Sequence, residues 1–176
     1  MIEFTRNHFE LFGLPARFRV DAADLERAYR ELQRNVHPDR YAGASDQEKR
    51  LALQASARVN EAYRTLKDPV ARAEYLLRLA GVDATAETDT RLPVDFLMRQ
   101  LERREGADEA RAAHDERALA AIVDDVRGEA AELLGVVERT LDGDDREVAR
   151  MHVRELRFLA KLGDDLREMQ LAELDR

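Results

Sequence analysis

The chain of 176 residues contains no cysteine and no tryptophan, and only 6% of its residues are aromatic. The absence of cysteine excludes disulfides, thiolate metal sites and cysteine nucleophiles. No apolar run approaches the roughly 20 residues that a membrane-spanning helix needs. The first residues carry charges of both signs and do not resemble a secretory signal or a transit peptide. We therefore expect a cytoplasmic protein that does not bind membranes.

Proline and glycine are also scarce, whereas 38% of the residues are charged and 44% are hydrophobic. This composition favours a helical, folded chain over a disordered one. Residues 1–80 carry 14 basic and 12 acidic side chains, but residues 81–176 carry 15 basic and 25 acidic ones. Such asymmetry indicates two parts with different partners, although ordinary solvated helix faces would also produce it. The overall charge of −8 argues against nucleic-acid binding.

Apolar residues in the first part recur at helical spacing. Asn7 is a candidate cap for a short helix, and Asp21 for a longer one that Pro38 ends. Its apolar stripe comprises Leu25, Ala28, Tyr29, Leu32 and Val36. A capping box of Ser45 and Glu48 opens the next helix, with an apolar face of Leu51, Ala55, Val59, Ala62, Tyr63 and Leu66. Two such helices joined by a short loop predict an antiparallel hairpin. A further helix starts at Asp68–Pro69 and closes at Gly81.

The second part has the pattern of a helical bundle. Residues 82–92 have little apolar content and no period, so we expect a linker over 81–92. Pro93 opens a helix, and two longer patterns follow on either side of a turn at LDGDD. Their apolar positions are Leu119, Ile122, Val126, Ala130, Leu133, Val137 and Leu141, and then Val148, Leu156, Leu159, Leu166 and Leu174. The fold class predicted is all-α, with a helical hairpin and short helices over 1–80 and an antiparallel three-helix bundle over 93–176.

Arrangements that carry enzyme chemistry are missing from the sequence. It has no glycine-rich phosphate loop and no His-Glu-x-x-His motif, and its four histidines are scattered. Acidic pairs such as Asp124–Asp125 are typical of solvated helix faces. We expect no enzyme activity, no cofactor and no metal site.

The tripeptide His37–Pro38–Asp39 lies on the loop of the predicted hairpin, behind a helix with an arginine-rich outer face. This arrangement resembles the J domain, by which co-chaperones stimulate the ATPase of DnaK-class chaperones. Four segments are more specific: HFELFGLPARF, LQRNVHPDRY, SARVNEAYRTLKDPVARAEYLL and DFLMRQLERRE. They are similar to the HscB family, the J-type co-chaperones of bacterial iron–sulfur cluster assembly. The resemblance covers nearly the whole chain and implies an L-shaped protein of two modules.

The resemblance implies a role for the loop and for the basic face beside it. His37, Pro38 and Asp39 would trigger ATP hydrolysis in a chaperone of the HscA or DnaK class, and the sequence does not distinguish these two. The docking face would comprise Arg27, Arg30, Arg34 and Arg40. Arginine steers encounter with acidic partners and pairs with carboxylates in a bidentate manner. The alternative is a solvated face whose arginines form only local ion pairs.

The resemblance also implies that the bundle binds the scaffold protein IscU, through apolar and acidic residues on one face. The matching positions are Leu97, Met98, Leu101, Glu102, Glu105, Glu109 and Phe158. The alternative is that the apolar members belong to the bundle core. Arg99, Arg103 and Gly106 depart from the family pattern and put the polar rim of the patch in doubt.

These observations favour a co-chaperone that stimulates the ATPase of a DnaK- or HscA-class chaperone and delivers IscU to it, which promotes maturation of iron–sulfur proteins. A J-domain adaptor that brings a different client to DnaK is the alternative. A purely structural coiled-coil protein would leave residues 8–18 unexplained.

Overall fold

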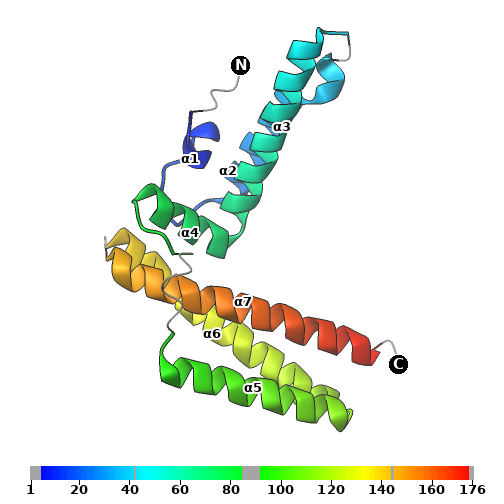
Figure 1. Ribbon diagram of the computed structural model, residues 1–176, viewed down its shortest axis with the longest axis vertical. Coiled ribbons are helices and arrows are strands. Elements are labelled where there is room, and N and C mark those ends of the chain that lie inside the picture. Colours follow the sequence, from blue (N-terminus) through cyan, green and yellow to red (C-terminus); the bar gives the residue numbers. More distant parts are fainter. Residues whose placement is uncertain (1–4, 42, 85–91, 144, 175–176) are drawn as a thin grey trace. The chain divides into compact units, whose positions relative to one another are not determined.

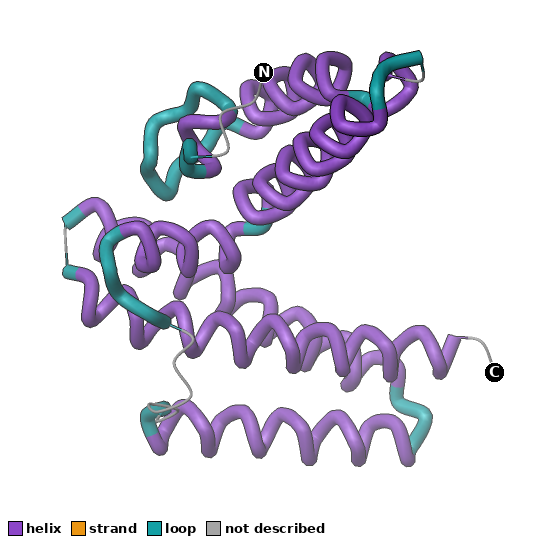
Figure 2. The backbone as a smooth tube through the Cα atoms, turned by 45° about the horizontal axis from the view of Figure 1, so that its top comes forward, coloured by secondary structure: helices purple, strands orange, loops and turns teal. Residues whose placement is uncertain are grey.

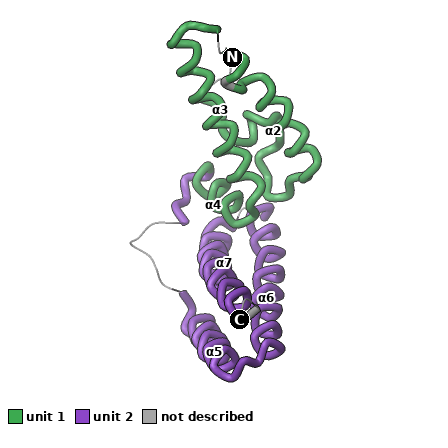
Figure 3. Tube along the Cα trace, turned by 90° about the vertical axis from the view of Figure 1, so that its right-hand side faces the viewer, with its two compact units in different colours: residues 1–79 green, residues 80–176 purple. Residues whose placement is uncertain are grey.

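The structure is a computed structural model that describes residues 5–41, 43–84, 92–143 and 145–174. None of these residues lies in a strand, as Figure 2 shows, so the prediction of an all-α chain is confirmed. The chain forms two compact units that divide between Leu79 and Ala80 (Figure 3). No helix in the described ranges has both the length and the apolar character needed to cross a bilayer.

Unit 1 is built around an antiparallel hairpin of two helices (Figure 1). Its elements are α1 (His8–Leu11), α2 (Ala22–Val36), the 3-10 turn η1 (Pro38–Tyr41), α3 (Asp46–Lys67) and α4 (Pro69–Leu79). The caps lie where the sequence predicts them: Asp21 accepts hydrogen bonds from two backbone amides of α2, and Ser45 and Glu48 form a capping box on α3. These side chains satisfy backbone donors that a helix start leaves without partners.

The core of unit 1 lies between α2 and α3 and is covered by α1. Phe9, Val59 and Leu66 are fully buried there, and the burial of each side chain contributes on the order of 2 kcal/mol to the free energy of folding. The predicted inward position of Leu51 is wrong, because its side chain is 41% exposed and Ala52 is buried instead. The later members of the predicted face, such as Ala55 and Val59, are buried, so only its first position points past the core.

Unit 2 contains the predicted three-helix bundle. Its helices are α5 (Val94–Ala112), α6 (Glu116–Asp142) and α7 (Arg146–Leu174), of which α6 and α7 share the most extensive contact. The core includes Leu119, Leu159 and Leu166. Val148, predicted to face inward, is exposed, and Ala149 and Val153 occupy the buried positions. The spacing of the leucines alone did not reveal that an alanine takes the first inward position of α7.

The segment that follows α4 is held against α7. Gly81, which was predicted to end this helix, adopts a φ of +80° just after α4, a conformation typical of a glycine that follows a helix end. Ala84 is buried, and its carbonyl accepts a hydrogen bond from Nε of Arg154 at 3.3 Å. Residues 85–91 of the expected linker lie outside the described residues. The start of that segment therefore belongs to the packed part of unit 2.

Candidate functional site

The turn after α2 exposes two polar side chains. His37 has an extended backbone, with φ −59° and ψ 129°, as the residue before a proline should. The chain then enters η1, where the amide of Arg40 donates to the carbonyl of His37 at 3.1 Å. The side chains of His37 and Asp39 are 56% and 89% exposed, and His37 Nδ1 lies 3.5 Å from Asp39 Oδ2. The imidazole and the carboxylate are therefore presented together to the solvent.

Side chains from η1 fix this turn to the end of α2. Arg40 Nη1 donates to the carbonyl of Arg34 at 3.1 Å, and the Tyr41 hydroxyl donates to the carbonyl of Asn35 at 3.3 Å. Both carbonyls belong to the last turn of a helix, where no intrahelical donor remains. A cation there also complements the helix dipole. Sequence reasoning missed Tyr41, although a hydroxyl five residues after a helix end is a recognisable capping candidate.

The basic face of α2 is partly neutralised by its own helix. Arg27 pairs with Asp24 at 2.6 Å, and Arg30 pairs with Glu26 at 2.9 Å. Arg34, in contrast, donates from Nε to the carbonyl of Arg30 and has no carboxylate partner among the described residues. Local ion pairing, the alternative considered for this face, thus applies to two of these arginines. Exposed pairs of this kind are weak and exchange readily with a partner's carboxylates.

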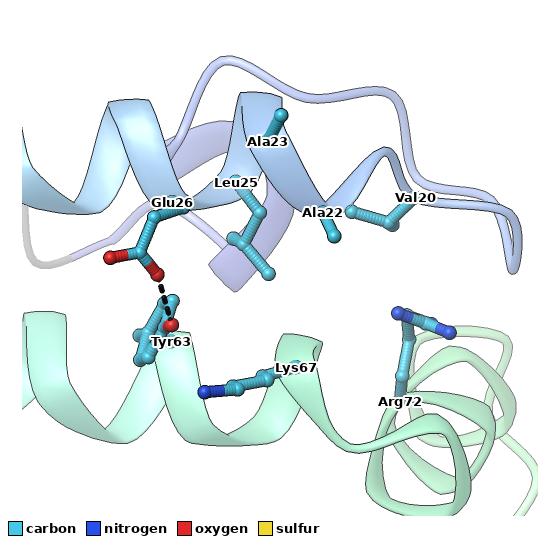
Figure 4. Close-up of a pocket in the computed structure, with 8 residues that line it drawn as sticks. All are labelled: Val20, Ala22, Ala23, Leu25, Glu26, Tyr63, Lys67 and Arg72. Carbon is cyan, nitrogen blue, oxygen red and sulfur yellow. Dashed lines mark hydrogen bonds between the residues drawn. The ribbon is translucent and has the colours of Figure 1, made fainter.

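A polar contact between α2 and α3 borders a cavity of about 350 Å³ at the start of α2. Figure 4 shows the Tyr63 hydroxyl donating to the Glu26 carboxylate. This hydrogen bond, followed by the one from Arg30, holds the pKa of Glu26 below its usual range, and it raises the pKa of Tyr63. Lys67 and Arg72 line the same cavity. The contact sets how α2 lies on α3 and so supports the exposed arginines.

In unit 2, four large apolar side chains that were predicted to bind a partner lie at the surface. Leu97, Met98 and Leu101 of α5 are 41%, 52% and 50% exposed, and Phe158 of α7 is 38% exposed. Phe96 takes the buried position and contacts Phe158 edge-on, with ring centroids 5.7 Å apart. The alternative that these residues form the bundle core is therefore wrong for Leu97, Met98 and Leu101. Leu97, Leu101 and Phe158 line a groove of about 410 Å³ between α5 and α7, whereas Met98 is not part of its lining.

The three acidic residues predicted beside this patch follow Met98 along α5. Glu102, Glu105 and Glu109 are four, seven and eleven residues after it, so all share one stripe of the helix. All three are exposed, and none forms a hydrogen bond or ion pair through its side chain with another described residue. The patch thus combines accessible apolar area with carboxylates that have no partner in the described part of the chain.

The arginines that depart from the family pattern join α5 to α6. Arg103 pairs with Asp125 at 2.6 Å and with Glu129, and its side chain is only 14% exposed. Arg99 contacts Glu129 at 3.0 Å. Burial raises the pKa of Glu129, but the hydrogen bonds from Arg103, Arg99 and Gln100 outweigh it and hold that pKa below the usual range. Both arginines therefore act within the bundle and do not form the rim.

Gly106, the third departure, lies where α5 approaches α6. A Cβ atom at this position would meet Ile122 Cδ1 at 3.4 Å. This is an ordinary contact with the end of a flexible side chain, so the helix packing here does not depend on the glycine.

The histidines outside the turn take structural positions. His8 is buried against the Tyr75 ring, with centroids 4.2 Å apart. Burial, then the nearby Arg58, lowers the pKa of His8 to about 4. His114 and His152 contact Glu173 and Glu155. Within the described residues, no group of three or more His, Asp or Glu side chains has the arrangement of a metal site.

Comparison with known families gives a class for each unit. Residues 7–75 match the DnaJ domain, and residues 92–167 match the HSCB C-terminal oligomerisation domain. The first range contains the hairpin with its exposed turn, and the second contains the three-helix bundle. The fold and the turn therefore define a J-domain protein, a class that works with DnaK/Hsp70-type chaperones.

Individual relatives narrow this class. The chain is 47% identical over 166 residues to the "Co-chaperone protein HscB homolog" of Aromatoleum aromaticum, and the aligned residues cover 94% of each chain. It is similar to the structure of the chaperone HscB from Vibrio cholerae, with 38% identity, a TM-score of 0.83, and coverage of 93% of this chain and 96% of that one. The human co-chaperone protein HscB is 33% identical, with a TM-score of 0.88 and coverage of 94% and 82%. The chain belongs to the HscB family of co-chaperones.

This membership confirms the resemblance found in the sequence. Its relatives are named co-chaperones, which is a non-catalytic role, and the family implies iron–sulfur cluster assembly.

Proposed function

We propose that this protein stimulates ATP hydrolysis by a DnaK- or HscA-class chaperone and delivers the iron–sulfur cluster scaffold IscU to it. Unit 1 acts through His37, Pro38 and Asp39, and the basic face of α2 docks onto the chaperone. Unit 2 binds the scaffold through the apolar patch and its acidic stripe. The observation that carries the proposal is the Asp39 carboxylate, which is 89% exposed beside His37 on a turn fixed by Arg40.

Rigid presentation of Asp39 favours an action on a neighbouring protein. A carboxylate on a fixed turn loses little conformational freedom when it meets a cationic partner, so more of the interaction energy reaches the complex. The arginines of α2 lie on the helix that leads into the turn and raise the rate of encounter with an acidic surface. One element therefore brings the chaperone near while the turn makes the specific contact.

A single-turnover ATPase measurement tests this first half. The purified chaperone is mixed with the wild-type chain, with Asp39→Asn or with Asp46→Asn, a control at an exposed aspartate elsewhere in unit 1. We expect stimulation by the wild type and by Asp46→Asn, and loss of stimulation with Asp39→Asn. Full stimulation by Asp39→Asn would exclude the proposed role of the turn.

A separate binding measurement tests the second half. Calorimetry with the scaffold protein of the same organism should show binding to the wild-type chain and loss of binding when Leu101→Ala and Phe158→Ala are combined. Both side chains are exposed, so their truncation should leave the fold intact, which circular dichroism checks. Retention of the scaffold by this double variant would point to another surface or to another client.

A further inference from the structure

The groove between α5 and α7 has two edges and one closed end. Its apolar lining is formed by Leu97, Leu101, Phe158 and Leu162. At one end Arg104 of α5 approaches Asp165 of α7, with 3.6 Å between Nη1 and Oδ2. These two opposite charges neutralise each other, so this end closes the groove without adding net charge.

The groove exists because α5 is held more closely to α6 than to α7. Arg103 and Arg99 of α5 reach Asp125 and Glu129 of α6. No comparable set of charged contacts joins α5 to α7 in the described residues; the Arg104–Asp165 pair is the ion pair that links them. The apolar side chains between these helices therefore stay partly uncovered.

Available side chains of opposite charge lie on α5 and α7 at this groove. On α5, Glu105 follows the groove-lining Leu101 by one helical turn and is exposed, so it lies on the helix face next to the groove. On the α7 edge Lys161 lines the groove, is exposed, and has no hydrogen bond or ion pair with another described residue. Most other cations of the bundle are engaged by carboxylates, as are Arg99, Arg103, Arg104, Arg111, Arg127 and Arg167. Lys161 is thus a cation available to a partner on the α7 side of the groove, and Glu105 is an available carboxylate next to its α5 side.

We propose that Lys161 is a further binding residue of the groove and that the groove accepts an amphipathic client segment with a basic edge and an acidic edge. The apolar side chains of that segment would lie on Leu101 and Phe158. Its cations would face Glu105, and its carboxylate would face Lys161. This inference rests on the proposed function, because the client is the scaffold protein assigned to this surface.

Charge of opposite sign on the two edges gives the groove a direction. A segment inserted the other way round would place its cations against Lys161 and its carboxylate against Glu105, and like charges in contact disfavour that arrangement. Apolar contacts alone do not distinguish the two orientations, because they are non-directional. Lys161 therefore contributes chiefly to which segment binds and how it lies.

An exchange of charge between Lys161 and Glu105 tests which way round the segment lies in the groove. Lys161→Glu and Glu105→Lys are made singly and together, and affinity for the scaffold is measured by calorimetry at low and at physiological salt. Each single reversal should weaken binding about tenfold at low salt. The double variant has the wild-type net charge but reversed polarity, and it should remain at least about tenfold weaker than the wild type.

The matched control swaps charges elsewhere on the bundle. Arg127→Glu with Glu132→Lys makes the same exchange at exposed positions of α6 and should bind as the wild type does. Thermal unfolding checks that every variant is folded. The conservative Lys161→Arg should retain binding, because it keeps the positive charge.

Three outcomes would overturn the inference. Wild-type affinity in the double swap, together with loss of binding in Leu101→Ala with Phe158→Ala, would leave the scaffold-binding function standing and remove the role of Lys161. No binding of the scaffold to the wild-type chain would remove both. The third outcome would come from sedimentation equilibrium. If the wild-type chain self-associates and the double variant of Lys161 and Glu105 does not, a second copy of this chain occupies the groove.

Discussion

The two units expose different kinds of surface. In unit 1, Leu51 and Leu53 are exposed and two residues apart on α3, so they point in different directions, and the exposed Leu79 lies on another helix, α4. In unit 2, Leu97, Leu101 and Phe158 converge on one groove. A helical hairpin that buries its apolar stripe exposes mainly polar side chains, and in the proposed function it acts through the turn between its helices. In unit 2, α5 packs mainly on α6, which leaves apolar side chains of α5 and α7 accessible.

The charges differ in a corresponding way. The arginines of α2 largely have local partners, as Arg27 and Arg30 show, whereas the acidic stripe of α5 has none among the residues that the structure describes. Local pairs reduce what an interaction with a partner gains, because they must be exchanged on binding. Side chains without a partner contribute their whole charge to the encounter. The pairing of individual side chains therefore indicates which charges are available to a partner better than the balance of basic and acidic residues in each unit does.

The largest expected effect separates buried from exposed leucine within unit 2. Leu166→Ala should lower the free energy of unfolding by about 3 kcal/mol, because Leu166 is fully buried and leaves a cavity. Leu101→Ala should change it by less than about 0.5 kcal/mol, since Leu101 is half exposed. Urea unfolding followed by circular dichroism measures both. Equal losses would mean that the groove residues belong to the core after all.

A second prediction concerns the acid sensitivity of unit 1. The folded pKa of His8, about 4, lies below its ordinary value of 6.5, so the unfolded chain takes up the proton first. Stability should fall as the pH is lowered from about 6.5 to about 4, with a loss of about 2 kcal/mol between pH 7 and pH 5.

Replacement of His8 by phenylalanine removes this titration and preserves a ring against Tyr75. Thermal unfolding of unit 1 in His8→Phe should therefore show a smaller decrease between pH 7 and pH 5. The same decrease in both proteins would exclude burial of the imidazole as its origin.

A third prediction places the acid sensitivity of unit 2 lower on the pH scale. Hydrogen bonds from arginine hold the pKa of Glu129 below 4.5, so its stabilising contribution is present above that pH and is lost as the pH falls through the folded value. Arg103→Ala should cost about 2 kcal/mol at pH 7, because it leaves the Glu129 carboxylate partly buried without its main partner.

The difference between Arg103→Ala and the wild type should therefore shrink below pH 4.5. Denaturant unfolding at pH 7 and at pH 3.5 measures it. Arg127→Ala, which removes an exposed pair with Asp124, is the control and should cost less than about 0.5 kcal/mol. A similar cost for both variants would show that Arg103 is no more than a surface pair.

The smallest expected effect ranks the arginines of α2. Arg34→Ala should weaken docking onto the chaperone about fivefold. This guanidinium forms no ion pair with another described residue, so binding breaks no existing pair. Arg27→Ala and Arg30→Ala should weaken it about twofold, because Asp24 and Glu26 already compensate these charges. The concentration of co-chaperone that gives half-maximal ATPase stimulation measures the ranking. An effect of Arg27→Ala equal to that of Arg34→Ala would show that local pairing does not matter.

The sequence predicted helices and caps well because both depend on neighbours within a few residues. The capping box at Ser45, the break at Pro38 and the end at Gly81 are local signals, and all three were found where expected. The inward face was less certain wherever the apolar pattern began or ended. Leu51 and Val148 show this, since each lies one residue from an alanine that occupies the buried position.

By itself, the sequence determined that this chain is helical, where its helices begin, that a polar turn carries His37 and Asp39, and that its segments resemble the HscB family. Only the tertiary structure decided which charges are available, because ion pairs such as Arg103 with Asp125 join residues 22 positions apart. The same holds for the groove, since α5 and α7 meet through packing that no local pattern encodes. Pairing and packing between distant elements thus separate the side chains that hold this fold from those that remain available to a partner.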